Sequence, residues 1–137
     1  MSICGLIEQQ AKARPGATAV VYPGCGDGGE ARLTYGELST AANRLAAHLR
    51  ARGAGRGERV VVSLRPGPRM VTAFLALARA GMVCVPVDPS APAGWRRAVV
   101  RDSAARTVLT EGDGAQYSGP GVRVVRVDAE AAEIAGR

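Results

Sequence analysis

The chain has 137 residues, of which 18 are Lys or Arg and 12 are Asp or Glu, so its net charge is +6. This length can bury one sizeable core and leaves no room for a second catalytic domain. Hydrophobic residues make up 47% of the chain and charged residues 22%, which is typical of a globular protein and excludes a disordered tail.

Several classes of partner are disfavoured by the same composition. The longest apolar stretch, residues 70–78, is far shorter than the roughly 20 residues needed to span a bilayer. Glu8 lies where a secretory signal would have its apolar core, so we expect a cytoplasmic protein without a membrane partner. Basic residues are dispersed and aromatic residues are few, so we expect no nucleic-acid partner. Cys4, Cys25 and Cys84 fit neither a disulfide framework nor a zinc site.

The first elements are a helix and a hairpin. Apolar residues with helical spacing predict a helix over residues 3–14. Residues 17–34 follow as a hairpin, with strands at 17–22 and 31–34 around a glycine-rich loop. The loop contains G-x-G-x-x-G at residues 24–29, but the dinucleotide-binding fingerprint needs a helix directly after the glycines. A hairpin loop is therefore the favoured interpretation.

The strongest local signal begins at Thr34. Thr34 and Glu37 have the spacing of a capping box, in which each side chain accepts a hydrogen bond from the other residue's backbone N–H. Leu33 and Leu38 flank this box as a hydrophobic staple. A long helix with one apolar face is therefore expected to start here and to end at the glycines of residues 53–57.

Strands and helices then alternate up to residue 127. Strands are expected at 59–64, 107–110 and 122–127, with a buried one at 82–87, and helices at 70–78 and 93–103. Gly81 ends a helix, Pro86 places its strand at a sheet edge or strand end, and Asp128 is expected to cap a short last helix. This order predicts one α/β domain over residues 1–137, with a largely parallel sheet flanked by helices.

The candidate chemical groups are few. His48 is the only histidine; it has no neighbouring Ser, Cys or carboxylate in the sequence, so we expect a packing residue. A single histidine also excludes the familiar zinc hydrolase arrangements. Glu111 and Asp113 share a loop and could form a carboxylate pair, but the loop looks solvated, so we do not expect the raised pKa that general acid chemistry needs. Arg97 and Arg101 lie one turn apart on a helix face expected to be solvated. We therefore predict no catalytic, cofactor-binding or metal-binding residue.

Two stretches together resemble the adenylation domains of nonribosomal peptide synthetases, which belong to the acyl- and aminoacyl-adenylating enzymes. The first core motif of that family is similar to Leu33-Thr34-Tyr35-Gly36-Glu37-Leu38, and the second is similar to residues 77–89, which include Gly81, Pro86, Asp88 and Pro89. The resemblance covers nearly the whole chain in order. Both motifs are mainly structural in the family.

The resemblance implies the N-terminal subdomain of an adenylate-forming enzyme, ending before the phosphate loop. The residues that bind ATP and the acid, and the catalytic lysine, come later in the family. The isolated chain is thus expected to need no cofactor, with ATP and Mg bound only when a partner completes the site. We expect a non-catalytic interaction or assembly module in natural-product biosynthesis, as a homodimer or in a complex with another synthetase component. One half of a split adenylating enzyme, and a small-ligand-binding or regulatory protein, are the alternatives.

Overall fold

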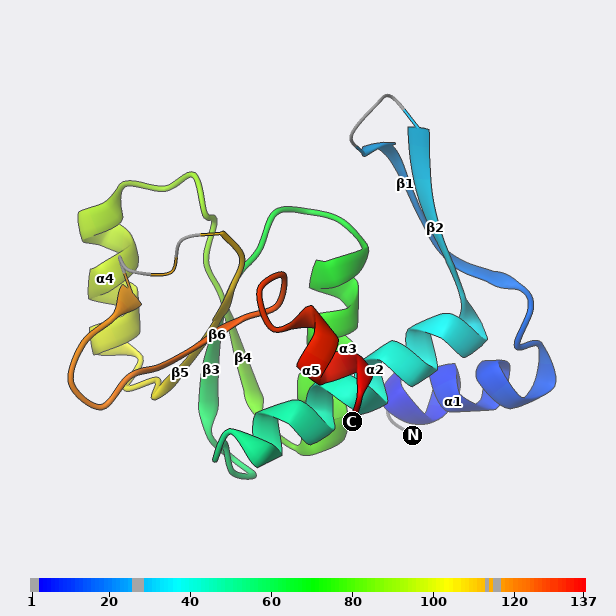
Figure 1. Ribbon diagram of the computed structural model, residues 1–137, viewed down its shortest axis with the longest axis horizontal. Helices are drawn as coiled ribbons and strands as arrows, with labels where there is room; N and C mark the ends of the chain where they lie inside the picture. Colours follow the sequence, from blue (N-terminus) through cyan, green and yellow to red (C-terminus); the bar gives the residue numbers. More distant parts are fainter. Residues whose placement is uncertain (1–2, 26–28, 113, 115–116) are drawn as a thin grey trace.

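A computed structural model describes residues 3–25, 29–112, 114 and 117–137. Figure 1 shows a hairpin that stands apart from a sheet flanked by helices. The elements are α1 (Ile3–Ala13), β1 (Thr18–Cys25), β2 (Gly29–Thr34), α2 (Tyr35–Ala51), β3 (Arg59–Ser63), α3 (Pro68–Ala80), β4 (Val83–Pro86), α4 (Ala93–Asp102), β5 (Thr107–Thr110), β6 (Arg123–Arg126) and α5 (Ala131–Ala135). None of the described helices is long and apolar enough to cross a bilayer.

The main sheet has four parallel strands in the order β4-β3-β5-β6. Val60 of β3 lies opposite Cys84 of β4 on one side and Thr107 of β5 on the other. Helix α3 connects β3 to β4, and α4 connects β4 to β5, as is usual for parallel pairing. The predicted α/β class with a largely parallel sheet is confirmed.

The strands of this sheet bury side chains on both faces. Val60 and Val62 of β3 pack with α2 and α3 in the larger core. Val61 points to the opposite face and packs with Val108 and with Val100 of α4 in a second core. Because successive side chains of a strand alternate between faces, one run of valines serves both layers. The result is a sheet between α2 and α3 on one side and α4 on the other.

The hairpin is longer than the sequence indicates. β1 and β2 pair in antiparallel fashion, from Thr18 opposite Thr34 to Cys25 opposite Gly29. In the G-x-G-x-x-G stretch, Gly24 and Cys25 belong to β1 and Gly29 begins β2, and residues 26–28 lie outside the described part of the chain.

The capping box predicted for α2 is confirmed. Thr34 N–H donates to Glu37 Oε1 over 3.0 Å, and Glu37 N–H donates to Thr34 Oγ1 over 3.1 Å. Leu38 is buried in the larger core, and Leu33 packs against the same core. These bonds satisfy two of the N–H groups that a helix start leaves without partners, and so fix where α2 begins.

The second motif forms a helix end and an edge strand. α3 ends at Gly81, which has φ 71° and ψ 28° in the left-handed region. β4 follows at the edge of the sheet and ends at Pro86. The position at an edge and strand end that Pro86 predicts is confirmed, but the predicted burial is wrong, because an edge strand has a neighbour on one side only and Val83 is 49% exposed. Asp88, next to Pro89, accepts hydrogen bonds from the backbone and hydroxyl of Ser90, which lower the pKa of Asp88.

The cap predicted for the last helix is also wrong. The N-cap of α5 is Glu130, whose side chain makes no capping bond. The Asp128 carboxylate instead accepts from Gly112 N–H and Ala129 N–H, each over 2.8 Å. The hydrogen bond from Gly112 is the main reason that the pKa of Asp128 lies below its ordinary value. Asp128 therefore ties the loop after β5 to the turn after β6.

Candidate functional site

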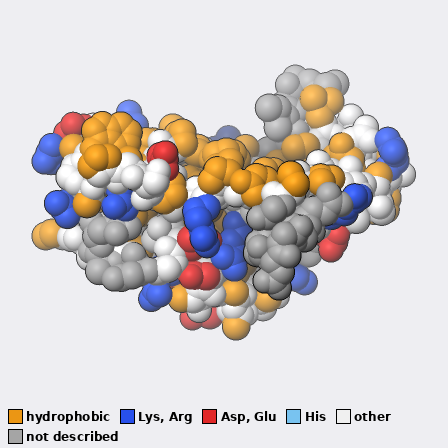
Figure 2. Space-filling view, turned by 90° about the horizontal axis from the view of Figure 1, so that it is seen from above, with side chains coloured by type: hydrophobic (Ala, Val, Ile, Leu, Met, Phe, Trp, Pro, Cys, Tyr) orange, Lys and Arg blue, Asp and Glu red, His pale blue; other side chains and the backbone are white. Residues whose placement is uncertain are grey.

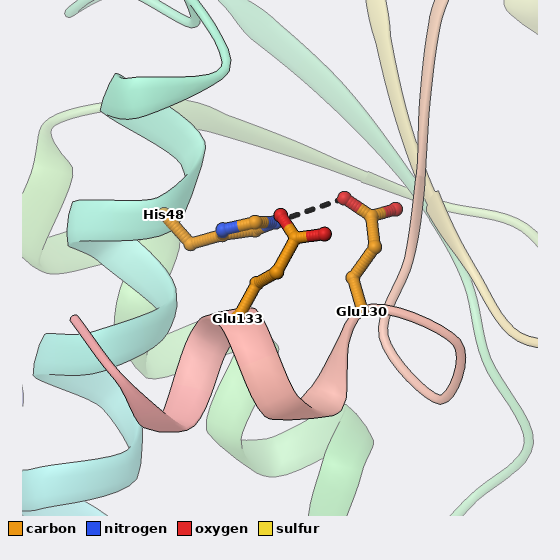
Figure 3. Close-up of side chains that lie close together, drawn as sticks. All are labelled: His48, Glu130 and Glu133. Carbon is orange, nitrogen blue, oxygen red and sulfur yellow. Dashed lines mark hydrogen bonds and ion pairs between the residues drawn. The ribbon is translucent and has the colours of Figure 1, made fainter.

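The end of α2 and the start of α5 bring together one histidine and two carboxylates (Figure 3). His48 is fully buried in the last turn of α2, and its Nε2 lies 2.9 Å from Glu130 Oε1. Glu133 lies one turn further along α5, and the three nearest ligand atoms are all within 4.8 Å of one another. The expectation that His48 has a packing role holds, but the expectation that it has no carboxylate partner is wrong.

Two arginines complete the cluster. Arg52, the C-cap residue of α2, pairs through Nη1 with Glu130 Oε1. Arg137 donates from Nε to His48 Nδ1 over 3.2 Å. A guanidinium group only donates, so Nδ1 must accept. The imidazole proton therefore lies on Nε2, which donates it to Glu130.

The second oxygen of Glu130 also has a partner. Glu130 Oε2 accepts from Arg126 N–H over 2.6 Å. Burial raises the pKa of the Glu130 carboxyl, but the hydrogen bonds from Arg126 and His48 and the charge of Arg52 outweigh it, and the pKa lies below its ordinary value of 4.5. Glu130 is thus an ionised acceptor at neutral pH.

This cluster does not fit a metal ion, despite its ligand types. A metal-binding imidazole normally coordinates through one nitrogen and donates a proton from the other to an acceptor. Here Arg137 takes the lone pair of His48 Nδ1, and the proton on Nε2 leaves that nitrogen without a free lone pair. Arg52 places a positive charge on the carboxylate oxygen that would bind the cation. The cluster is therefore an ion-pair network that fastens α5 to α2.

This network predicts a pH-dependent contribution to stability. A carboxyl with a lowered pKa stabilises the fold above its unfolded-state pKa, and this contribution is lost as the pH falls through the folded-state value. We expect Glu130→Gln to lower the free energy of unfolding by about 1–3 kcal/mol at pH 7. The difference from the wild type should shrink below pH 4.5, the ordinary value for Glu130. Urea unfolding at pH 7 and pH 3.5 measures both values.

The control for this prediction is Glu133→Gln, which changes an exposed carboxylate of the same helix. A difference between Glu130→Gln and wild type that is the same at both pH values would contradict the assigned role of the Glu130 charge.

A second polar group lies at the carboxyl ends of β3 and β5. The chain leaves β3 toward β4 on one side of the sheet and leaves β5 toward β6 on the other side. In α/β sheets, ligands usually bind at the point where the connections diverge in this way. Glu111 pairs here with Arg65 over 3.1 Å and Arg69 over 2.9 Å. Its side chain is only 13% exposed, so the expected solvated setting is wrong.

The electrostatics of Glu111 do not suit general acid chemistry. Burial raises the pKa of Glu111, but its hydrogen bonds with Arg65 and Arg69 outweigh this effect and hold the pKa below the ordinary value. The expectation that this pKa is not raised is therefore confirmed. Asp113, the other half of the predicted carboxylate pair, lies outside the described residues.

The hydroxyl pair at the end of β3 was not predicted from the sequence. Ser63 Oγ and Tyr117 Oη are buried and 2.5 Å apart, and the guanidinium carbon of Arg96 lies 5.7 Å from the centre of the Tyr117 ring. A serine nucleophile needs an adjacent base. The hydrogen-bond partner of Ser63 is a phenol instead, so this pair joins the sheet to the loop after β5. Arg97 and Arg101 are exposed, as expected.

An apolar groove of about 310 Å³ lies between α2, α3 and α5. Arg44 and Arg69 also line it. Its apolar lining consists mainly of Leu33, Ala41, Leu45, Pro68, Val127 and Ile134. The His48–Glu130 network holds α5 in place and so supports one wall of this groove.

The clusters missed by sequence reasoning had only weak signals. His48 and Arg52 are four residues apart, and Glu130 and Glu133 are three apart, so each pair shares a helix face. Such spacings are common, and nothing local connects the two pairs across 82 residues.

The sequence profile of the AMP-binding enzyme family matches residues 7–135. The chain belongs to the AMP-binding enzyme family. It is 39% identical over 119 residues to surfactin synthase subunit 2 of Bacillus subtilis, covering 87% of this chain and 3% of that protein. It is 36% identical over 132 residues to the phosphinothricin tripeptide synthetase PhsC of Streptomyces viridochromogenes, covering 96% of this chain and 12% of that protein.

The AMP-binding fold is also seen in solved structures. The complex of VinN with L-aspartate superposes with a TM-score of 0.83 and 27% identity, over 98% of this chain and 34% of that one. The N-terminal subdomain of Klebsiella oxytoca NpsA is similar in fold, with a TM-score of 0.79 and 23% identity, over 93% of this chain and 31% of that one. The chain thus corresponds to part of an adenylation domain and spans about a third of these structures.

Proposed function

We propose that this chain is a structural part of an adenylating unit in natural-product biosynthesis and is not catalytic on its own. Nearly the whole chain matches about a third of the VinN structure. The polar clusters give further support: among the described residues, Glu111, Glu130 and Ser63 are held by arginine or tyrosine partners. No arrangement of nucleophile, base and oxyanion donors arises from these groups.

Exposed apolar side chains support the proposal that the chain assembles with another polypeptide. Leu6, Val21, Val83 and Trp95 are each exposed by 45% or more. Figure 2 shows a broad band of hydrophobic side chains on the face that is uppermost in Figure 1. Apolar patches of this kind are usually covered by a partner. We propose that the partner is a synthetase component carrying the other two thirds of the adenylation fold, because this chain matches 34% of the VinN chain.

ATP–pyrophosphate exchange tests this proposal. The chain alone, supplied with ATP, Mg²⁺ and amino acids, should give no exchange above background. Combined with a polypeptide carrying a phosphate loop, an acid pocket and a catalytic lysine, it should form a complex in light scattering. Exchange by the chain alone would overturn the non-catalytic role. A strictly monomeric chain at high micromolar concentration, with and without that polypeptide, would overturn the assembly role.

The same experiment separates the alternatives. Exchange that appears only in the mixture would identify a split adenylating enzyme, in which ATP and Mg²⁺ bind to the completed site. A homodimer without affinity for the second polypeptide would identify self-assembly. Calorimetric binding of ATP, AMP or an amino acid to the chain alone would instead favour a small-ligand-binding protein.

A further inference from the structure

At the outer edge of β6, other residues and not a neighbouring strand form the hydrogen bonds with the backbone. Parallel pairing with β5 uses Arg123 N–H, which donates to Arg106 O, and Val127 N–H, which donates to Thr110 O. Backbone groups alternate in direction along a strand. The N–H and C=O groups of Val124 and Arg126 therefore point away from β5, to the side where another strand would pair.

Arg52 and Glu130 occupy that side. Arg52 Nη2 donates to Val124 O over 3.3 Å. Glu130 Oε2 accepts from Arg126 N–H over 2.6 Å, and Glu130 N–H donates to Arg126 O over 2.8 Å. Three of the four outward groups of these two residues thus have partners that a strand would otherwise supply. His48 holds the carboxylate in this position from the buried side.

The other edge of the sheet is protected differently. β4 ends at Pro86, which lacks an N–H group and cannot donate to a further strand. Cys84 N–H is thus the outward donor that remains in this four-residue strand. β6 has no proline, and its central residues are β-branched valines, which favour strand pairing. Without Arg52 and Glu130, β6 would be an open edge suited to pairing.

We propose that Arg52 and Glu130 prevent the β6 edge from pairing with a second copy of this chain, because they occupy its outward backbone hydrogen-bonding groups. A two-fold axis at Val125 would place Val124 of one copy opposite Arg126 of the other and form four hydrogen bonds between the edges. In this register Arg126 faces Val124 and Arg123 faces Val127, so no arginine lies directly opposite another. The surface is thus self-complementary, as a symmetric dimer requires. His48 acts as a positioning residue for Glu130.

Replacement of Glu130 tests the proposal. In Glu130→Ala, the Arg126 amide should exchange with solvent about tenfold faster than in wild type at low protein concentration, because its acceptor is lost. At high micromolar concentration the variant should sediment as a larger species than wild type. Glu133→Gln, which alters the exposed carboxylate of the same helix, should match wild type in both measurements.

A proline variant shows whether β6 is the surface that pairs. Arg126→Pro removes an N–H that points away from β5, at a residue with an exposed side chain. Added to Glu130→Ala, it should restore the wild-type sedimentation. Association that persists in this double variant would overturn the proposal. Arg52→Gln, which frees Val124 O and removes the ion pair with Glu130 but keeps the Glu130 side chain, provides an independent test if Glu130→Ala does not fold. A folded Arg52→Gln that sediments like wild type would then overturn the proposal.

Discussion

Leu49→Ala is expected to lower the free energy of unfolding by about 2–5 kcal/mol, because it leaves a cavity in a core that relaxes only partly. Leu49 is fully buried in α2, beside His48, and belongs to the core that joins α2 and α3 to the sheet. A small domain has about 5–15 kcal/mol of stability in total. Urea unfolding followed by circular dichroism at pH 7 measures the loss.

Arg50→Ala is the matched control for this substitution. Arg50 is the next residue on α2, and it is exposed. Its replacement should change the free energy of unfolding by about 0.5 kcal/mol or less. If the two variants unfold at the same urea concentration, α2 does not pack against the sheet through Leu49.

Gly81→Val is expected to lower the free energy of unfolding by about 1–3 kcal/mol, since a β-branched residue is strained in the left-handed region. Gly81 has φ 71°, and a Cβ atom there would lie 2.9 Å from Arg56 Cγ. The Gly81 carbonyl also accepts from Gly57 N–H over 2.7 Å, which connects the start of β4 to the turn before β3. Thermal unfolding measures the effect.

Gly94→Ala is the control that replaces a glycine whose backbone is not in the left-handed region. Gly94 lies in the first turn of α4, and no heavy atom lies within 4 Å of the position a Cβ would take. This change should leave stability unaltered or raise it by up to about 1 kcal/mol. Equal losses in Gly81→Val and Gly94→Ala would show that the left-handed conformation is not required at Gly81.

Features with a local cause were predictable from the sequence. The capping box at Thr34 and Glu37 depends on residues three apart, and the helix end at Gly81 depends on the conformation of one glycine. Thr107–Thr110 was predicted with the bounds that the structure has. In each case the chemistry that decides the structure lies within a few residues.

Features that depend on strand order were not predictable in this way. Pro86 indicated a sheet edge or a strand end for the run at 82–87, but the strand that β4 pairs with is decided only by the order β4-β3-β5-β6. The pairs His48–Glu130 and Ser63–Tyr117 join residues 82 and 54 positions apart. Their partners are set by how helices and strands pack, and no local pattern contains that information. The candidate site therefore came almost entirely from the structure.

The strand order also determines the order in which the sheet can form during synthesis. β3 is the first of the four strands to leave the ribosome, yet it needs partners on both sides. Its Arg59 pairs with Val83, 24 residues later, and its Val60 with Thr107, 47 residues later. Until Thr107–Thr110 has been made, Val60–Val62 lie at an open edge with their apolar side chains incompletely covered. A version of the chain ending before Thr107 should therefore be prone to aggregation, and only versions that include β5 protect the central strand.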